Sequence, residues 1–142
     1  MITEKAKRKL ALFLKEFYTK ANVGSGGDST NPNSNVLDAP MLADASMVAT
    51  SNSTSGNSTI DFTASISGAQ LTGVTAREFG IFGDIPVDTG FDEMRTEGVA
   101  PETSDGSEAT TEQVMLARVN FDGIGPFSAT DQIDFTLTME VE

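Results

Sequence analysis

The sequence contains no cysteine, no histidine and no tryptophan, and its single tyrosine is Tyr18. Without cysteine the chain has no disulfide and no thiolate metal site. Without histidine it lacks the commonest general base and the commonest metal ligand. This excludes Ser-His-Asp and Cys-His nucleophiles and histidine zinc centres within one chain. A carboxylate pair or an all-oxygen Ca²⁺ site remains chemically available. These absences favour a protein that is not an enzyme, with an enzyme built on a carboxylate pair as the alternative.

Basic residues are also scarce, and they are unevenly placed. The chain has 9 basic and 21 acidic residues, for a net charge of −12. Residues 1–20 hold six of the basic residues and two of the acidic ones, a local charge of +4, which leaves −16 on the rest. A body this acidic repels phosphate, so we expect no nucleic-acid partner. No apolar run is long enough to cross a membrane, so we expect no membrane partner.

Residues 3–20 are predicted to form an amphipathic helix within an N-terminal segment, 1–23. Apolar side chains recur there at helical spacing, and Thr3 can accept a hydrogen bond as the N-cap. The helix must end by the glycines at 24–27. Its apolar face either packs on its own chain or docks on a neighbouring copy or another protein; a helix lying on a membrane surface is a third alternative. The candidate contact residues are Leu10, Phe13, Leu14, Phe17 and Tyr18.

Residues 24–56 are rich in glycine, serine, asparagine and threonine, and we predict a loop-rich linker. Asn52-Ser53-Thr54 within it matches the glycosylation acceptor pattern, which we interpret as turn composition. Strand patterns begin after residue 57. Alternating apolar and polar residues at 59–67 and 133–141, with β-prone segments at 74–82 and 114–121, predict four strands. The predicted fold is mainly β: an antiparallel β-sandwich over residues 57–142 with one N-terminal amphipathic α-helix.

A long acidic stretch, residues 83–113, interrupts the predicted sandwich. Long irregular loops are often functional. The carboxylates of Asp84, Asp88, Asp92 and Glu93 could supply oxygen ligands to Ca²⁺, although their spacing does not match the EF-hand pattern. The alternative is a solvated loop, since an acidic chain clusters carboxylates by chance. We expect no other cofactor and no small-molecule substrate.

Charged residues are depleted in strands, yet Arg77 and Glu78 lie in the middle of one predicted strand and Arg118 lies in another. We predict a structural polar pair among these side chains that fixes strand register. Contacts between copies, or a solvated position, are the alternatives. Gly80 in the same strand predicts a close backbone approach, because glycine has no side chain to pack.

The segment Val74-Thr75-Ala76-Arg77-Glu78-Phe79-Gly80-Ile81-Phe82 resembles a T-x-x-E-hydrophobic-G-hydrophobic-F segment of tailed-phage proteins in the tail-collar fibre and baseplate-associated group. An alternating strand precedes it at 59–67, and a leucine-small-arginine strand follows at 116–121. A terminal strand introduced by a polar turn at 128–132 completes the order. The basic N-terminal helix with its glycine-rich turn is similar too. The chain departs from the family at 83–113, where a short turn is usual.

The resemblance implies a non-catalytic structural protein of a tailed virus particle, assembled in the host cytoplasm. It implies a homo-oligomer, with a trimer favoured, that contacts other virion proteins in the tail, collar or baseplate or attaches a fibre. For Glu78 it implies a structural role, in strand register or a subunit contact. Two other functions remain open: a capsid decoration or head-fibre protein, and a module that binds glycans or Ca²⁺.

Overall fold

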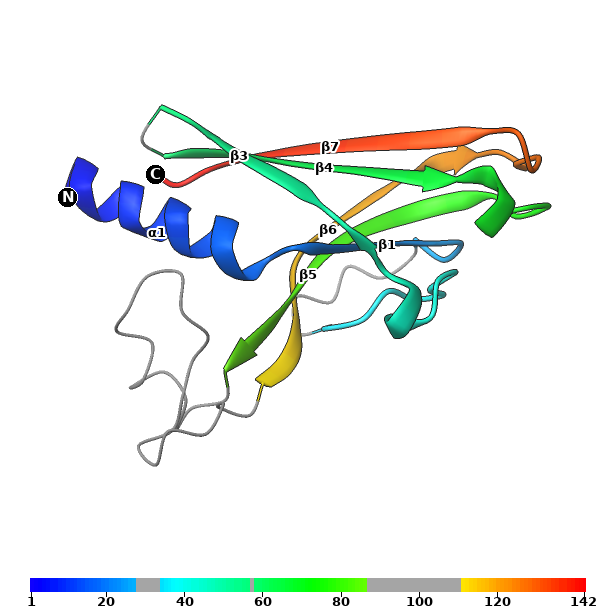
Figure 1. Cartoon of the computed structure of the whole chain (residues 1–142), viewed down its shortest axis with the longest axis horizontal. Coiled ribbons are helices and arrows are strands. Elements are labelled where there is room, and N and C mark those ends of the chain that lie inside the picture. The colour runs from blue at the N-terminus through cyan, green and yellow to red at the C-terminus, as the bar shows by residue number, and fades with distance from the viewer. Residues whose placement is uncertain (28–33, 57, 87–110) are drawn as a thin grey trace.

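The computed structural model describes residues 1–27, 34–56, 58–86 and 111–142. Within them the chain is mainly β, with two antiparallel sheets and one N-terminal α-helix, which confirms the predicted fold class (Figure 1). The elements are α1 (Glu4–Phe17), β1 (Lys20–Gly24), the 3-10 turn η1 (Asp44–Ser46), β2 (Val48–Ala49), β3 (Ser51–Ser55), β4 (Thr59–Ser67), the 3-10 turn η2 (Gly68–Gln70), β5 (Ala76–Pro86), β6 (Thr111–Ile124) and β7 (Gln132–Glu140).

The first sheet has the strand order β2-β1-β5-β6 in the described residues. Its centre is β5, where Ile81 pairs with Ala21 of β1 on one side and with Ala117 of β6 on the other. Successive residues of a strand point to opposite faces of the sheet. Phe79 and Ile81 therefore enter the core, while the neighbouring Glu78 faces outward.

The second sheet has the order β3-β4-β7, and β4 pairs with β7 from Thr59↔Glu140 to Ser67↔Gln132. The alternation predicted for 59–67 is realised, because every second residue of β4 is buried. The two sheets pack face to face: the ring of Phe79 stacks on that of Phe135 in β7, with centroids 4.2 Å apart and planes 8° apart. The core therefore lies between the sheets, as a sandwich requires.

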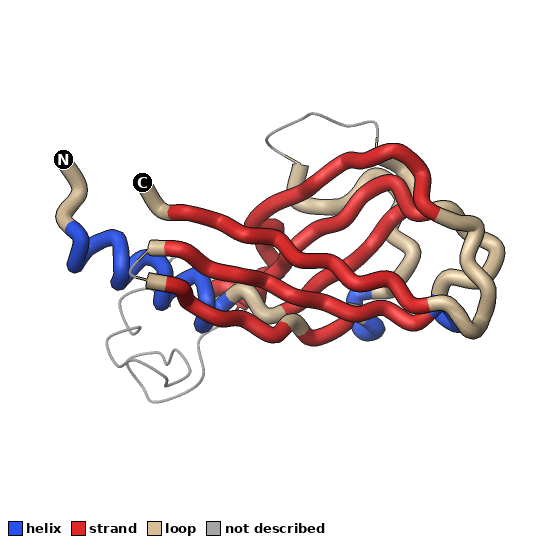
Figure 2. The backbone as a smooth tube through the Cα atoms, turned by 90° about the horizontal axis from the view of Figure 1, so that it is seen from above, coloured by secondary structure: helices blue, strands red, loops and turns tan. Residues whose placement is uncertain are grey.

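Helix α1 lies at one end of the sandwich and packs on β3, β4 and β5, so it contacts both sheets. Thr3 is its N-cap, because the Ala6 N–H donates to Thr3 Oγ1 at 3.2 Å. Ala11 is fully buried. The N-terminal end of the helix runs out past the ends of the strands (Figure 2). In the described part of the chain, no helix has the length and apolar character needed to cross a membrane.

The layout differs from the prediction in the first third of the chain. The helix ends at Phe17 because the residues that follow pair with β5 as strand β1. The predicted linker, 24–56, contains β2 and β3, and β3 pairs with β4 from Ser51↔Thr63 to Ser55↔Thr59. The backbone supplies the hydrogen bonds of a strand, so polar side chains do not prevent pairing at a sheet edge.

The predicted insertion, 83–113, is bounded by strands. β5 continues to Pro86 and β6 begins at Thr111, and these two residues pair with each other. Residues 87–110 lie outside the described residues. The insertion therefore joins two long, paired strands of the first sheet.

Candidate functional site

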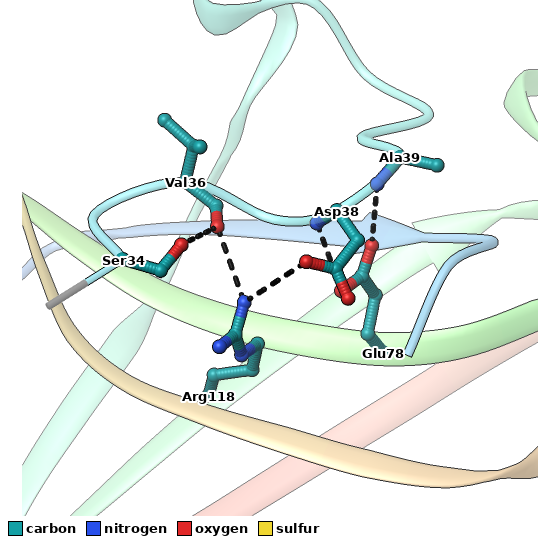
Figure 3. A network of polar contacts seen from close by, with 6 residues as sticks. All are labelled: Ser34, Val36, Asp38, Ala39, Glu78 and Arg118. Atoms are coloured by element: carbon teal, nitrogen blue, oxygen red, sulfur yellow. Dashed lines mark hydrogen bonds and ion pairs between the residues drawn. The ribbon is translucent and has the colours of Figure 1, made fainter. Parts of the chain in front are cut away.

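Residues 34–43, which we call the strap, cross the outer face of the first sheet and are held there by Glu78 (Figure 3). The Glu78 side chain is fully buried. Its Oε1 accepts the Ala39 N–H at 2.8 Å, and its Oε2 accepts the Asp38 N–H at 3.1 Å. Hydrogen bonds to an ionised acceptor are among the stronger ones in proteins. The carboxylate thus clamps the middle of the strap.

Two glycines, which have no side chain, make room for the Glu78 carboxylate and for the strap. A Cβ on Gly24 would collide with the Glu78 carboxylate, and one on Gly26 would collide with the side chain of Asp38. Gly27 has a φ of +89°, which side-chain-bearing residues rarely adopt. The glycine-rich run that the sequence suggested as a helix stop is therefore the seat of the strap.

Two asparagines fix the ends of the strap. Asn22, 1% exposed, donates from Nδ2 to the Leu42 carbonyl at 2.9 Å and accepts the Leu42 N–H at 3.3 Å. Asn35 donates to the Gln113 carbonyl at 2.7 Å and accepts the Met115 N–H at 2.5 Å. The two hydrogen bonds of Asn35 imitate those of one residue in a neighbouring strand, because they satisfy one carbonyl and one N–H group along the edge of β6.

The strap also packs on the sheet through Leu37, which is 3% exposed. A Cβ on Gly80 would press on Leu37 and on the ring of Phe82. The close approach predicted at Gly80 is therefore present, but side chains make it rather than backbone.

The predicted polar pair needs a correction, because its members are joined through the strap and not to each other. Arg118 Nη1 lies 3.5 Å from Asp38 Oδ1 and donates to the Val36 carbonyl at 3.3 Å (Figure 3). The register pairs Arg118 with Gly80, and the Glu78 oxygens already accept strap N–H groups. Arg77 is exposed, because the pairing of β5 with β6 is irregular between Ala76 and Glu78 and the regular alternation of faces is interrupted there.

This cluster suits holding a segment in place. Each oxygen of the Glu78 carboxylate accepts one backbone N–H group, so the side chain is held in one position. Every buried side-chain nitrogen and oxygen in the described residues has a hydrogen-bond partner. The polar contacts of this cluster therefore hold the strap on the sheet.

The five predicted contact residues of the helix divide into two groups. Phe13, Leu14 and Phe17 pack against the core of their own chain, and Tyr18 is buried in it. Burial raises the pKa of the Tyr18 hydroxyl. Leu10 is 47% exposed, so of this set it alone offers a large exposed apolar surface.

Asn52 of β3 fixes the C-terminal end of this helix. Its Nδ2 donates to the carbonyls of Lys15 and Tyr18, each at 2.9 Å, and its Oδ1 accepts from the Thr50 hydroxyl at 2.8 Å. These carbonyls are among those that a helix end leaves without partners. The amide that the glycosylation pattern would modify is thus engaged within the fold, and it lies in strand β3, whereas its composition predicted a turn.

Of the four candidate Ca²⁺ ligands, the structure describes Asp84. Its carboxylate pairs with Lys20 at 2.8 Å across β5 and β1. Asp88, Asp92 and Glu93 lie outside the described residues. Among the residues that are described, no group of three or more carboxylates is gathered closely enough to hold a metal ion.

The side of the sandwich between β6 and β7, which we call the β6–β7 side, is incompletely covered. In the described residues β6 ends the first sheet and β7 ends the second. Val119 is 40% exposed although its strand partner Phe79 belongs to the core. The inward-facing Phe135, Leu137 and Met139 of β7 are each only partly buried. An apolar surface is therefore accessible between the two edge strands.

Acidic residues are frequent in the segment that contains β6 and β7. From Thr111 to Glu142 the chain has six acidic residues and one basic residue, Arg118. The Ser65 hydroxyl and the Gln132 amide hold the pKa of Asp134 on β7 below its ordinary value. Asp134 therefore stays ionised at neutral pH, and the segment 111–142 as a whole is negatively charged.

Comparison of the chain with protein-family models and with curated proteins gives no match.

Sequence reasoning missed Asn22, Asn35 and Asn52, which hold the strap and the helix. Asn22 carried a usable signal, since it stands between Ala21 and Val23 in a short apolar segment where a polar side chain requires a partner. Asn35 and Asn52 carried none, because each lies among other polar residues of the predicted linker.

Proposed function

We propose that this chain is a non-catalytic structural protein of a tailed virus particle, forming an oligomeric tail, collar, baseplate or fibre-attachment component. Its partners are other copies of itself and other virion proteins, and it is assembled in the host cytoplasm. The resemblance of residues 57–142 to the tail-collar fibre and baseplate-associated group supports this proposal.

One structural observation carries most of the weight. The helix packs on the sandwich while its N-terminal end runs out past the strands (Figure 2). Ile2, just before the helix, and Leu10, in its middle, are each 47% exposed. Large apolar side chains on a projecting, basic segment favour contact with another protein. An acidic body with a projecting basic end is a shape suited to joining subunits.

An antibody against the purified chain, applied to virus particles from a host that carries the gene, tests the proposal by electron microscopy. Labelling at the tail, collar or baseplate is the expected result. Labelling over the head would favour the capsid decoration alternative. Particles that lack the chain altogether, both by labelling and by mass spectrometry, would refute the virion assignment.

Calorimetry of the purified chain distinguishes the proposed structural protein from the alternative, a module that binds glycans or Ca²⁺. Titration with Ca²⁺, and separately with a panel of surface glycans, is expected to give no saturable heat. Stoichiometric binding of either ligand would favour a recognition module over a purely structural subunit.

A further inference from the structure

We propose that the projecting end of α1 in one copy docks on the β6–β7 side of a second copy. This interface rests on the proposed function as an oligomeric assembly protein and gives it a contact surface. The occupant of the β6–β7 side is thus a second copy of this chain.

The helix has the anchors that such a contact needs. Ala6 and Leu10 are four residues apart, so they share one face of α1, and Ile2 lies just before the N-cap residue Thr3. All three are exposed, and Ile2 and Leu10 each expose 47% of their surface. Apolar anchors at this spacing are how an amphipathic helix lies in a groove.

The receiving surface offers the matching apolar area. Val119 exposes 40% of its surface beside the stacked rings of Phe79 and Phe135. Phe121 lies next to them, with its ring centroid 5.9 Å from that of Phe135. Leu137 and Met139 continue the surface along β7. A helix lying here would remove these side chains from water.

The distribution of charge along the chain favours a second copy as the occupant of the β6–β7 side. Residues 1–20 carry +4, with Lys5 and Arg8 exposed beside the apolar anchors. The receiving segment, 111–142, holds six acids and one arginine, including exposed Asp122, Asp134 and Glu140. Opposite charges across an interface steer encounter and set the orientation. Two copies that meet through segment 111–142 would instead bring two negatively charged segments together.

The helix of the same copy is committed elsewhere. Its C-terminal half packs on β3, β4 and β5, and Asn52 holds its last turn. A continuous helix of 14 residues does not bend back across the sandwich to β6 and β7. The contact is therefore between copies and of the heterologous kind, which closes into a ring such as a trimer when the rotation allows.

Light scattering on the purified full-length chain tests the interface with three single variants. Leu10→Asp places a charge on the donated helix, and Val119→Asp places one on the receiving surface. Val36→Asp is the matched control, because Val36 is 63% exposed but lies on the strap. We expect Leu10→Asp and Val119→Asp each to have the mass of a monomer, and Val36→Asp to keep the mass of the unmodified oligomer. Circular dichroism checks that each variant is folded, and Val119→Thr replaces Val119→Asp if the latter does not fold.

Mixing gives the decisive readout. The Leu10→Asp chain keeps a good receiving surface, and the Val119→Asp chain keeps a good helix. An equimolar mixture should form a 1:1 dimer and nothing larger, because one contact forms and the ring cannot close. A mixture that stays monomeric, or an oligomer that both variants leave intact, would overturn this interface. Either result leaves the virion assignment to be decided separately by antibody labelling.

Discussion

Replacing Glu78 with alanine should weaken the attachment of the strap to the first sheet. The substitution removes the acceptor of two N–H groups, those of Asp38 and Ala39. A hydrogen bond to a charged group contributes about 1.5–3 kcal/mol, so the pair contributes roughly 3–6 kcal/mol. Removing the carboxylate also removes the cost of holding a charge out of water. We therefore expect a net loss near 3 kcal/mol in the free energy of unfolding.

The strap itself limits how large this loss can be. If the strap lifts into water, its amides regain partners, but Leu37 and the underlying Phe82 become exposed. Exposing two such side chains costs about 3–6 kcal/mol, which is similar to the loss of the two hydrogen bonds. The variant should therefore either unfold more easily or populate a state with the strap released. Glu78→Gln should fall between alanine and the unmodified chain, because it keeps one accepting oxygen.

Urea unfolding followed by circular dichroism at one protein concentration measures the change. Hydrogen exchange of residues 34–43 reports whether the strap opens locally. Glu112→Ala is the control, since it removes the same side chain from an exposed position on β6. It should change the unfolding free energy by less than about 0.5 kcal/mol. A Glu78→Ala chain within about 1 kcal/mol of the unmodified one, with unchanged exchange at Asp38 and Ala39, would refute the clamp.

Three further predictions concern the helix junction, the strap seat and the charge of the interface. Tyr18 is the only tyrosine, so its phenolate absorbance can be titrated directly. The midpoint should lie above that of the urea-unfolded chain, and stability should be lost as pH rises from about 10 through the folded-state pKa. Coincident midpoints would contradict its burial. Asn52→Asp replaces a donor by an acceptor at the helix end and should cost about 1–3 kcal/mol in thermal unfolding, whereas Asn52→Gln should cost less. Gly24→Ala should destabilise by at least about 1–3 kcal/mol, because its methyl group meets the Glu78 carboxylate. If Asn52→Asp leaves the stability unchanged, Asn52 does not stabilise the helix end. If Gly24→Ala leaves it unchanged, the close contact between Gly24 and the Glu78 carboxylate is refuted.

The sandwich could be predicted because its strands carry their own pattern. The alternation in 59–67 matches β4 residue for residue, and that in 133–141 matches β7 to within one residue at each end. One buried face and one wet face impose a period of two on the sequence. The helix could be predicted for the same reason, because its apolar residues recur with a period of 3.6 residues.

The first third of the chain could not be predicted in the same way. β1 is buried on both faces, between the core and the strap, so its burial does not alternate, and the strand of five residues is too short to carry a clear pattern. β3 is polar throughout and takes its register from β4 rather than from its own side chains. The groups that bind Glu78 could not be predicted either, because they are backbone N–H groups and do not depend on the side chain of the residue that carries them. Charge alone predicts that Arg118 pairs with Glu78, but the strap lies between these two side chains.

The mass of the purified full-length chain in solution tests the central claim most directly. Light scattering over a range of protein concentrations at low salt is expected to give a discrete oligomer, with three times the 15.0 kDa of one chain favoured. Because opposite charges contribute to the contact, raising the salt concentration should lower the average mass. A chain that stays at 15.0 kDa at every concentration and salt would contradict self-assembly through the helix and the β6–β7 side.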